Sequence, residues 1–454
     1  MSIPQSAGGP IETRDDLVRH LSDGCKPKSE WRIGTEHEKF VYDLKTHKPL
    51  DYATKPGIRQ LLDGMRQFGW EPVLEGENII GLTQNGASLS LEPGGQFELS
   101  GAPLKSVHET CAEVNLHQEQ TRTVAEAIGA GVIGIGFAPT WSMQDTHQMP
   151  KGRYQIMRRY MPKVGGYGLD MMFRTCTVQV NLDFASEADM VKKMRVGLAL
   201  QPIATALLAN SPFREGKPNG FLSYRSQIWT DVDNARAGML PWAFESGMSF
   251  ERYVDYALDV PMYFVFREGE YVDAAGQSFR DFLEGKLPAL PGEKPTIADW
   301  TDHLSTAFPE VRLKSFLEMR GADGGRWGRI CALPALWVGL LYSGTALDAA
   351  WDRVKHWTIA EREELRHSVP KLALEAPVPG GGTVRELSEE VLEIATSGLR
   401  ERAEFNPAGD NEGGFLDPLR DVVASGKTFA EKMLDRYHGE WQGDVSHVYE
   451  EFSF

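Results

Sequence analysis

The strongest constraint on the fold is the stretch SLSLEPGGQFELSG at residues 88–101, in which polar and apolar side chains alternate on both sides of a turn. Glu92 continues a polar row before the turn and Glu98 continues one after it. A period of two is typical of β-strands, and the intervening Pro-Gly-Gly suits a turn because proline fixes φ and glycine adopts positive φ without steric cost. The stretch therefore predicts a β-hairpin with one apolar face and one polar face that carries both glutamates.

Two carboxylates on one face repel each other unless a positive charge lies between them. A divalent cation with oxygen ligands would supply that charge, and a solvated outer face is the alternative. The same arrangement recurs at residues 31–42, a predicted strand in which Glu36 and Glu38 are two residues apart and so share a face. Paired carboxylates are therefore expected on two separate parts of a sheet.

The most informative strand is predicted at residues 175–184. Its even-numbered positions are apolar, and its odd-numbered positions form a polar row that includes Gln179 and Asn181. In a central strand such a row would line a wet cavity, whereas in an edge strand it would face solvent. The glutamates on the other predicted strands favour the cavity. Cys176 belongs to the apolar face, which argues against a role as a nucleophile.

One further strand is predicted at residues 311–320, with Phe316, Glu318 and Arg320 on one face. An acid and a guanidinium in this arrangement suit a metal ligand beside a phosphate-binding group, and a simple ion pair is the alternative. Arg153 lies in a basic segment of an otherwise acidic chain. It is a candidate for holding a carboxylate or phosphate, because guanidinium groups bind these anions through paired hydrogen bonds.

At 454 residues the chain could hold one large domain or two to three smaller ones. Residues 12–330 are predicted to make a sheet-rich catalytic part, and residues 331–454 a mainly helical buttress. Within the first part, the loop-rich and aromatic segment 211–241 is predicted to cover a site. Neither a Walker A sequence nor a dinucleotide-binding fingerprint is present.

Composition limits the partners. The net charge of −16 argues against nucleic acid and against a polybasic membrane contact. No run approaches the roughly 18–20 apolar residues of a membrane helix. The N-terminal sequence has the character of neither a secretory signal nor a transit peptide, so a cytosolic location is expected. The four cysteines are too few and too scattered for a disulfide scaffold or a zinc site.

Six blocks of sequence together resemble the plant and proteobacterial class of glutamate–cysteine ligase. They are GTEHEKF from residue 34, ENIIGL from residue 77, SLEPGGQFELSG from residue 90, MPKGRY from residue 149, DMMFRTCTVQVNLDF from residue 170 and LEMRGADGG from residue 317. The blocks occur in the same order, and the match runs from about residue 12 to the C-terminus.

This resemblance implies a single α+β domain over residues 1–454 with a glutamine-synthetase-like carboxylate–amine ligase fold, in which a curved antiparallel sheet forms a bowl with helices behind it. The implied reaction depends on ATP. The γ-carboxylate of L-glutamate attacks ATP to form γ-glutamyl phosphate, and the amino group of L-cysteine displaces the phosphate. The product is γ-glutamylcysteine, the precursor of glutathione. The oligomeric state, a monomer or a weak homodimer, stays open.

Phosphoryl transfer requires the charge of the triphosphate to be neutralised, which magnesium and arginine do well. The expected Mg²⁺ ligands are Glu36, Glu38, Glu92, Glu98, Gln179 and Glu318, with Asn181 as a further candidate. By the family match, Arg153 and Arg225 hold the carboxylates of glutamate, and Tyr263 and Trp327 form part of the amino-acid pocket. Arg320 is assigned to phosphate, and Arg153 and Arg320 are the expected catalytic residues.

The resemblance also bears on the cysteines. Plant members carry two regulatory cysteine pairs, and alanines, Ala274 and Ala289, occupy the positions of one pair here. The other pair maps onto Cys111 and Cys331. A disulfide between these two is an alternative, but reduced thiols are expected, since Cys111 lies on the apolar stripe of a predicted helix and the cytosol is reducing.

Three other functions remain alternatives. A related ligase that uses another amine would need the same metal and ATP residues. A metal-dependent hydrolase would turn over without ATP and would not need the arginine set of Arg153, Arg225 and Arg320. A non-catalytic binding protein is disfavoured by the intact acidic and basic rows.

Overall fold

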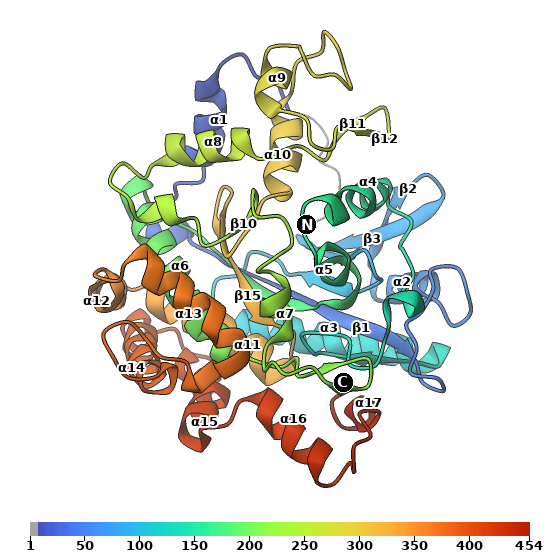
Figure 1. Cartoon of the computed structure of the whole chain (residues 1–454), viewed down its shortest axis with the longest axis vertical. Helices are drawn as coiled ribbons and strands as arrows, with labels where there is room; N and C mark the ends of the chain where they lie inside the picture. Colours follow the sequence, from blue (N-terminus) through green and yellow to red (C-terminus); the bar gives the residue numbers. More distant parts are fainter. Residues whose placement is uncertain (1–7) are drawn as a thin grey trace.

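The protein is built around a nine-stranded sheet in which every pairing is antiparallel (Figure 1). The computed structural model describes residues 8–454. The strand order is β14-β15-β7-β1-β5-β4-β3-β2, and β6 pairs with β1 outside this path. The strands are β1 (Ile33–Asp43), β2 (Glu71–Glu75), β3 (Asn78–Gln84), β4 (Ala87–Leu91), β5 (Phe97–Ser100), β6 (Ala130–Ile133), β7 (Thr177–Leu182), β14 (Val311–Leu313) and β15 (Leu317–Asp323).

The register of the central strands gathers polar side chains on one face. Glu36 of β1 lies opposite Gln179 of β7 and Ser100 of β5. Glu38 lies opposite Glu98, which is in turn opposite Ser90 of β4. Because residues that face each other across an antiparallel pair point to the same side, these polar residues share one face. The central place of β7 agrees with a polar row that faces a cavity rather than open solvent.

The hairpin expected at residues 88–101 is formed by β4 and β5. Its turn closes through a hydrogen bond from the Gly95 N–H to the Glu92 carbonyl, at 2.9 Å. Gly95 adopts a φ of +83°, which a residue with a Cβ rarely adopts. The Pro-Gly-Gly signal therefore marked the turn correctly.

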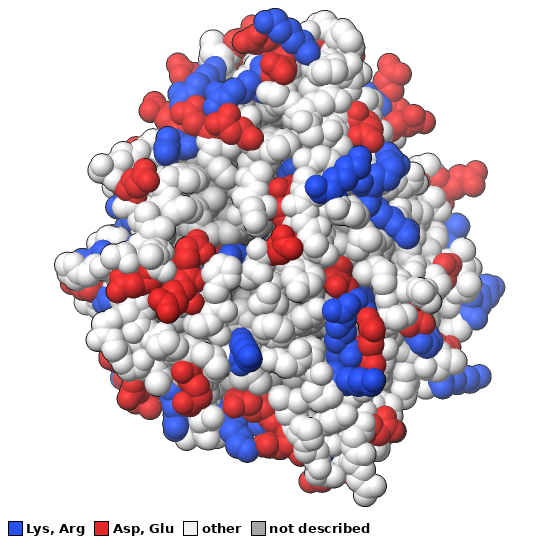
Figure 2. All heavy atoms as spheres, viewed as in Figure 1, with Lys and Arg blue, Asp and Glu red and all other residues white. Residues whose placement is uncertain are grey.

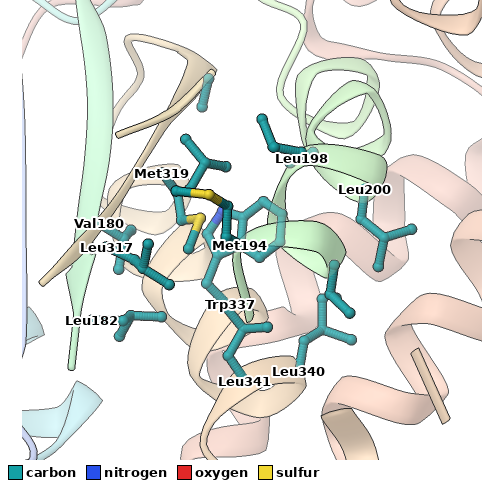
Figure 3. Packing of buried hydrophobic residues seen from close by; sticks show 14 of the residues in the cluster. Val180, Leu182, Met194, Leu198, Leu200, Leu317, Met319, Trp337, Leu340 and Leu341 are labelled. Atoms are coloured by element: carbon teal, nitrogen blue, oxygen red, sulfur yellow. The ribbon is translucent and has the colours of Figure 1, made fainter. Parts of the chain in front are cut away.

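The opposite face of the sheet carries the apolar core. Four helices pack on this face or on one another: α3 (Val107–Ile128), α6 (Glu187–Leu207), α11 (Trp327–Leu341) and α14 (Val384–Arg402). Helix α6 packs on β14 and β15, and α11 packs on β7, β1, α3 and α14. In Figure 3, Val180 and Met319 of the sheet meet Met194 of α6 and Trp337 of α11. The alternation in β7 therefore divides the structure into a polar side and a packed side.

The remaining helices surround this two-layer centre. They are α1 (Arg14–Ser22), α2 (Ile58–Met65), α4 (Gly152–Tyr160), α5 (Gly168–Arg174), α7 (Tyr224–Ile228), α8 (Phe250–Asp259), α9 (Phe279–Leu283), α10 (Ile297–Ser305), α12 (Gly344–Val354), α13 (Ile359–Leu372), α15 (Asp417–Ser425), α16 (Phe429–His438) and α17 (His447–Glu451). Three small strand pairs complete the fold: β8 (Phe213–Arg214) with β9 (Lys217–Pro218), β10 (Ala237–Gly238) with β13 (Phe308–Pro309), and β11 (Phe264–Arg267) with β12 (Glu270–Asp273). The α+β class is confirmed. The division into a sheet-rich part and a helical buttress stays a prediction, although one apolar core contains residues from Ile11 to Val423.

The single strand predicted at residues 311–320 is wrong. The segment forms two antiparallel strands, β14 and β15, which place Arg312 opposite Glu318. The connecting turn is closed by a hydrogen bond of 2.8 Å from the Lys314 N–H to the Phe316 carbonyl. Phe316 therefore lies in the turn and not on a strand face. The turn contains neither glycine nor proline, so the alternation of the sequence runs through it without a visible break.

Among residues 8–454, no single helix is long and apolar enough to cross a membrane; α11 and α12 reach that length and composition only together, and they are bent by 90°. Figure 2 shows Lys and Arg side chains interspersed with Asp and Glu side chains over one face of the molecule. The net negative charge is therefore not gathered into a single patch on that face.

Trp337→Ala should destabilise the protein strongly. Trp337 is fully buried between α6 and the sheet, and truncating a buried tryptophan leaves a cavity that costs about 3–5 kcal/mol. Urea-induced unfolding followed by circular dichroism would measure the loss. Trp327→Ala is the matched control, because Trp327 lies on the same helix but is 40% exposed. Equal losses for the two variants would contradict the place assigned to Trp337.

Candidate active site

A polar cavity that opens to solvent lies over the open face of the sheet and has a volume of about 100 Å³. Strands β1, β5 and β7 form its floor, and α4 and α7 contribute to its walls. Its charged and amide side chains are Glu36, Glu38, Glu92, Glu98, Gln96, Gln179, Arg153, Arg225, Arg312 and Arg320. The cavity therefore combines carboxylates and guanidinium groups that come from distant parts of the sequence.

Of the four glutamates of the cavity, Glu36 and Glu98 are buried and Glu38 and Glu92 are half-buried. Burial, followed by the charge of Glu92, raises the pKa of Glu98 to about 7. Burial and the charges of Glu92 and Glu98 raise the pKa of Glu38 well above its ordinary value. Neutral donors hold these carboxylates in place: the Ser90 hydroxyl donates to Glu98 at 2.5 Å, and the Thr177 N–H donates to Glu38 at 3.0 Å. The floor is thus a set of carboxylates that would ionise more readily beside an added cation.

This donor set fits a divalent cation that arrives with a phosphate ligand. Among residues 8–454, no three His, Cys, Asp or Glu side chains converge closely enough to hold a metal ion by themselves. Small hard cations in nucleotide-dependent enzymes are commonly held by one or two carboxylates, by waters and by the phosphates of the substrate. Four glutamates on an open floor can supply those one or two ligands.

Arg153 and Arg225 offer unused hydrogen-bond donors in this cavity. Arg153 is 4% exposed, lies with its guanidinium carbon 4.8 Å from the centre of the Phe264 ring, and donates to the Ser305 hydroxyl at 3.4 Å. Arg225 is 3% exposed and donates from Nη2 to the Arg320 carbonyl at 3.0 Å. The Nε of each has no hydrogen-bond partner among the described residues. Because a buried unpaired donor is costly, both arginines are suited to bind an anion.

Glu318, expected as a metal ligand, is bound by arginines in the structure, and its role toward a metal stays a prediction. It is fully buried, does not line the cavity, and accepts hydrogen bonds from Arg312 at 2.5 and 2.9 Å and from Arg320 at 2.9 Å. Burial raises the pKa of Glu318, but the charges of Arg312, Lys314 and Arg320 outweigh burial and hold it well below its ordinary value. Glu318 is therefore engaged by arginines and anchors them, as in the ion-pair alternative.

Arg312 lines the cavity but was missed in the sequence. Besides its two bonds to Glu318, it donates from Nη1 to the Ser305 and Ala307 carbonyls at 2.7 and 2.9 Å. The feature that identifies Arg312 is its position opposite Glu318. This pairing can be recognised only if residues 311–320 are read as a hairpin of two strands.

Two residues expected in the amino-acid pocket do not line this cavity. Tyr263 is buried beside it, with its hydroxyl 3.4 Å from the Met161 sulfur and its ring 3.9 Å from the guanidinium carbon of Arg236. Trp327 begins α11, which packs on the other side of the sheet, and it donates to the Cys111 carbonyl at 3.3 Å. A sequence match to a family does not show on which face of the sheet a helix such as α11 begins.

A buried lysine lies on the packed side of β1. Lys39 of β1 is fully buried, with its Nζ 3.0 Å from His37 Nδ1 and 2.7 Å from His117 Nε2. Burial lowers the pKa of Lys39 to about 7, while the charges of Cys176, Glu98 and Glu38 act in the opposite direction. Lys39, His37 and His117 therefore form a cluster beneath the polar floor. The alternation of residues in β1 did not predict this cluster.

Cys111 of α3 and Cys331 of α11 are both buried free thiols in the structure. Burial, together with the neighbouring Cys331, raises the pKa of the Cys111 thiol. The two residues are brought together as the resemblance implies, and the state of the pair in solution stays a prediction.

Comparison with known proteins decides the family. Residues 32–451 match the family described as glutamate-cysteine ligase family 2. The chain belongs to this family. The chloroplastic glutamate–cysteine ligase of Medicago truncatula is 57% identical over 443 residues, which cover 97% of this chain and 85% of that protein. The Arabidopsis thaliana protein of the same name is 58% identical, with 97% of this chain and 83% of that protein covered.

The fold is shared with a solved structure. The glutamate–cysteine ligase of Francisella tularensis, solved in complex with AMP, superimposes with a TM-score of 0.55 at 12% sequence identity. The match covers 93% of this chain and 89% of that chain. The resemblance drawn from the sequence, the fold class and the enzyme type are all confirmed.

The expected location is corrected by the same comparison. The Medicago, Arabidopsis and Nicotiana tabacum relatives are all named chloroplastic, and this finding contradicts the prediction of a cytosolic protein. A catalytic sequence carries the chemistry of the reaction, and it does not carry the compartment in which the reaction takes place.

Glu98→Gln should stabilise the protein at high pH in the absence of divalent cations. The folded state raises the pKa of Glu98 from 4.5 to about 7, so ionisation of this carboxyl weakens the fold. The penalty is absent below about pH 4.5, grows as the pH rises, and is complete above about pH 7. Melting temperatures of variant and wild type should therefore diverge across this range, with the variant higher above pH 7. An exposed control, Glu71→Gln, should show no such divergence, and parallel curves for Glu98→Gln would contradict the assignment.

Proposed function

We propose that the cavity is the site of an ATP- and Mg²⁺-dependent ligation of L-cysteine to the γ-carboxylate of L-glutamate, the first step of glutathione synthesis. The observation that carries the proposal is the meeting of four glutamates, two of them buried, with two buried arginines whose Nε atoms have no partner among the described residues. Metal-chelated phosphates need the glutamates, and a dicarboxylic amino acid needs the arginines. Family membership supports the same reaction.

The reaction has two steps. In the first, a γ-carboxylate oxygen of glutamate attacks the γ-phosphorus of ATP, the bond to the bridging oxygen breaks, and ADP leaves. In the second, the cysteine nitrogen attacks the acyl carbon of γ-glutamyl phosphate, phosphate leaves, and the nitrogen loses a proton as the amide forms. The first step builds up negative charge around phosphorus, and the second builds it up on the acyl oxygen and the leaving phosphate, so the catalytic task is chiefly positioning and charge stabilisation.

The residues of the cavity divide this task. Glu36, Glu38, Glu92 and Glu98, with Gln179, would hold Mg²⁺. When bound, Mg²⁺ supplies the positive charge that offsets the triphosphate. Arg153 and Arg225 would hold the carboxylates of glutamate, because their free donors are already buried and aimed by neighbouring groups. Arg320 would face the transferred phosphate from a position fixed by Glu318 and Gln179.

The first test is ADP release from the purified protein with ATP, Mg²⁺ and L-glutamate, with and without L-cysteine. Cysteine should stimulate release strongly, and γ-glutamylcysteine should be detected by mass spectrometry. Chelation of Mg²⁺ should abolish turnover and its return should restore it. Stronger stimulation by another amine would keep the mechanism and change the acceptor, whereas turnover that does not depend on ATP would contradict the proposal.

Arg225→Ala should raise the apparent KM for L-glutamate by about tenfold to a hundredfold, which is the loss expected for one or two charge-assisted hydrogen bonds. Steady-state kinetics with each substrate varied in turn would measure it. Arg158→Ala is the control, because Arg158 is an exposed arginine on α4 that does not line the cavity. A change confined to the KM for cysteine would reverse the assignment of the two amino-acid positions.

A further inference from the structure

A buried carboxylate behind the cavity ties down the segment that carries Arg225. Asp323 ends β15 and is 2% exposed. Its Oδ2 accepts hydrogen bonds from the Asn210 N–H at 2.8 Å and the Ser211 hydroxyl at 2.7 Å. Its Oδ1 accepts one from the Ser223 hydroxyl at 2.8 Å. One side chain therefore joins the two ends of the loop at residues 211–223.

The two serines pass this constraint on to α7. The Ser211 hydroxyl oxygen accepts a hydrogen bond from the Arg225 backbone N–H at 3.2 Å. The Ser223 hydroxyl oxygen accepts one from the Ser226 N–H at 3.3 Å and so caps the helix. Each serine donates its proton to Asp323 and uses its oxygen for α7. The backbone on both sides of the Arg225 side chain is thus fixed by the same carboxylate.

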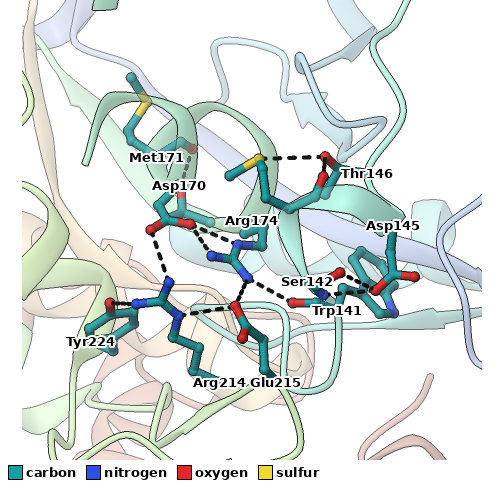
Figure 4. Close-up of polar contacts among 12 residues, drawn as sticks. Trp141, Ser142, Asp145, Thr146, Asp170, Met171, Arg174, Arg214, Glu215 and Tyr224 are labelled. Atoms are coloured by element: carbon teal, nitrogen blue, oxygen red, sulfur yellow. Dashed lines mark hydrogen bonds and ion pairs between the residues drawn. The ribbon is translucent and has the colours of Figure 1, made fainter. Parts of the chain in front are cut away.

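Helix α7 depends on such anchors because it is only five residues long. A helix of this length does not hold its shape on its own. Other contacts act on its flanks. Arg214 donates to the Tyr224 hydroxyl at 2.7 Å, and it belongs to a network with Asp170, Arg174 and Glu215 (Figure 4). Arg366 of α13 donates to the Trp229 carbonyl at 3.1 Å. Among the described contacts, Asp323 is the group that accepts a hydrogen bond from the Ser211 hydroxyl, and this hydroxyl accepts the bond from the Arg225 backbone N–H.

The charge of Asp323 also suits this task. Burial raises its pKa, and the charge of Arg225 together with the hydroxyl and N–H donors acts against that rise. Conversely, Asp323 is the leading charge that offsets the cost of burying Arg225. Arg225 therefore keeps a free Nε in the cavity while its charge is balanced from behind.

We propose that Asp323 is a positioning residue, which aims Arg225 at the anionic group of the substrate through Ser211 and Ser223. The identity of that anion, a carboxylate of L-glutamate, rests on the proposed function. The positioning itself does not, because it concerns only how α7 is held.

The test combines kinetics with hydrogen exchange. Asp323→Asn replaces one acceptor oxygen with a donor and should break at least one of the three bonds to the loop. It should raise the KM for L-glutamate by about tenfold or more, with a smaller change in kcat. In the Arg225→Ala background the same change should have little further effect, because residues that act through one another are not additive. An equal loss in both backgrounds would overturn the proposal.

Amide hydrogen exchange gives a readout that does not depend on the reaction. Asp323→Asn should accelerate exchange in residues 221–229 and leave the strands of the sheet floor unchanged. Unchanged exchange in residues 221–229 would overturn the positioning role even if the wild-type protein ligates cysteine. Conversely, faster exchange in a protein without ligase turnover would retain the positioning role and reject the proposed function.

Two variants guard against a general loss of folding. Ser223→Ala removes one of the three bonds and a helix cap, and should raise the KM for glutamate several-fold with the same dependence on Arg225. Asp183→Asn is the matched control: Asp183 is 4% exposed, follows β7, and binds Lys26 and the Arg32 N–H away from the cavity. It should lower the melting temperature without altering the KM for glutamate or exchange in residues 221–229. A rise in KM equal to that of Asp323→Asn would overturn the inference.

Discussion

Repulsion among neighbouring carboxylates is the constraint on which the architecture of this site depends. The charges of Glu92 and Glu98 raise the pKa of Glu38, the charge of Glu92 raises that of Glu98, and the register of β1 with β5 places Glu38 opposite Glu98. A chain that folds into this sheet cannot avoid that meeting. The floor is consequently stable with protons on some carboxylates or with a cation among them. The free energy stored in this repulsion is available to bind a divalent cation.

The arginines show how the same residue type serves two purposes. Arg312 uses its donors on Glu318 and on backbone carbonyls, so it builds the wall of the cavity. Arg153 and Arg225 each keep an unpartnered Nε. The Phe264 ring offsets part of the cost of burying Arg153, and the charge of Asp323 offsets part of the cost of burying Arg225. The difference between a structural and a ligand-binding arginine therefore lies in its partners and not in its degree of burial.

Several features followed from local patterns. The alternation in residues 175–184 predicted both the packed face and the polar row of β7, because side chains of a strand point to opposite faces in turn. The same rule placed Glu36 beside Glu38. It failed at residues 311–320, where a turn without glycine or proline continued the alternation and concealed the pairing of Arg312 with Glu318. Tyr263 and Trp327 do not line this cavity, and their assignment to the amino-acid pocket stays a prediction.

The sequence by itself determined the family, the enzyme class and the residue types of the floor, since these depend on contiguous blocks and on a period of two. Tertiary structure alone decided which charges meet. The sequence did not show that arginines enclose Glu318, or that Asp323 connects two loop ends more than ten residues apart. The physical reason is that the energy of an electrostatic interaction depends on the distance between the two charges in space. Separation along the sequence does not fix that distance.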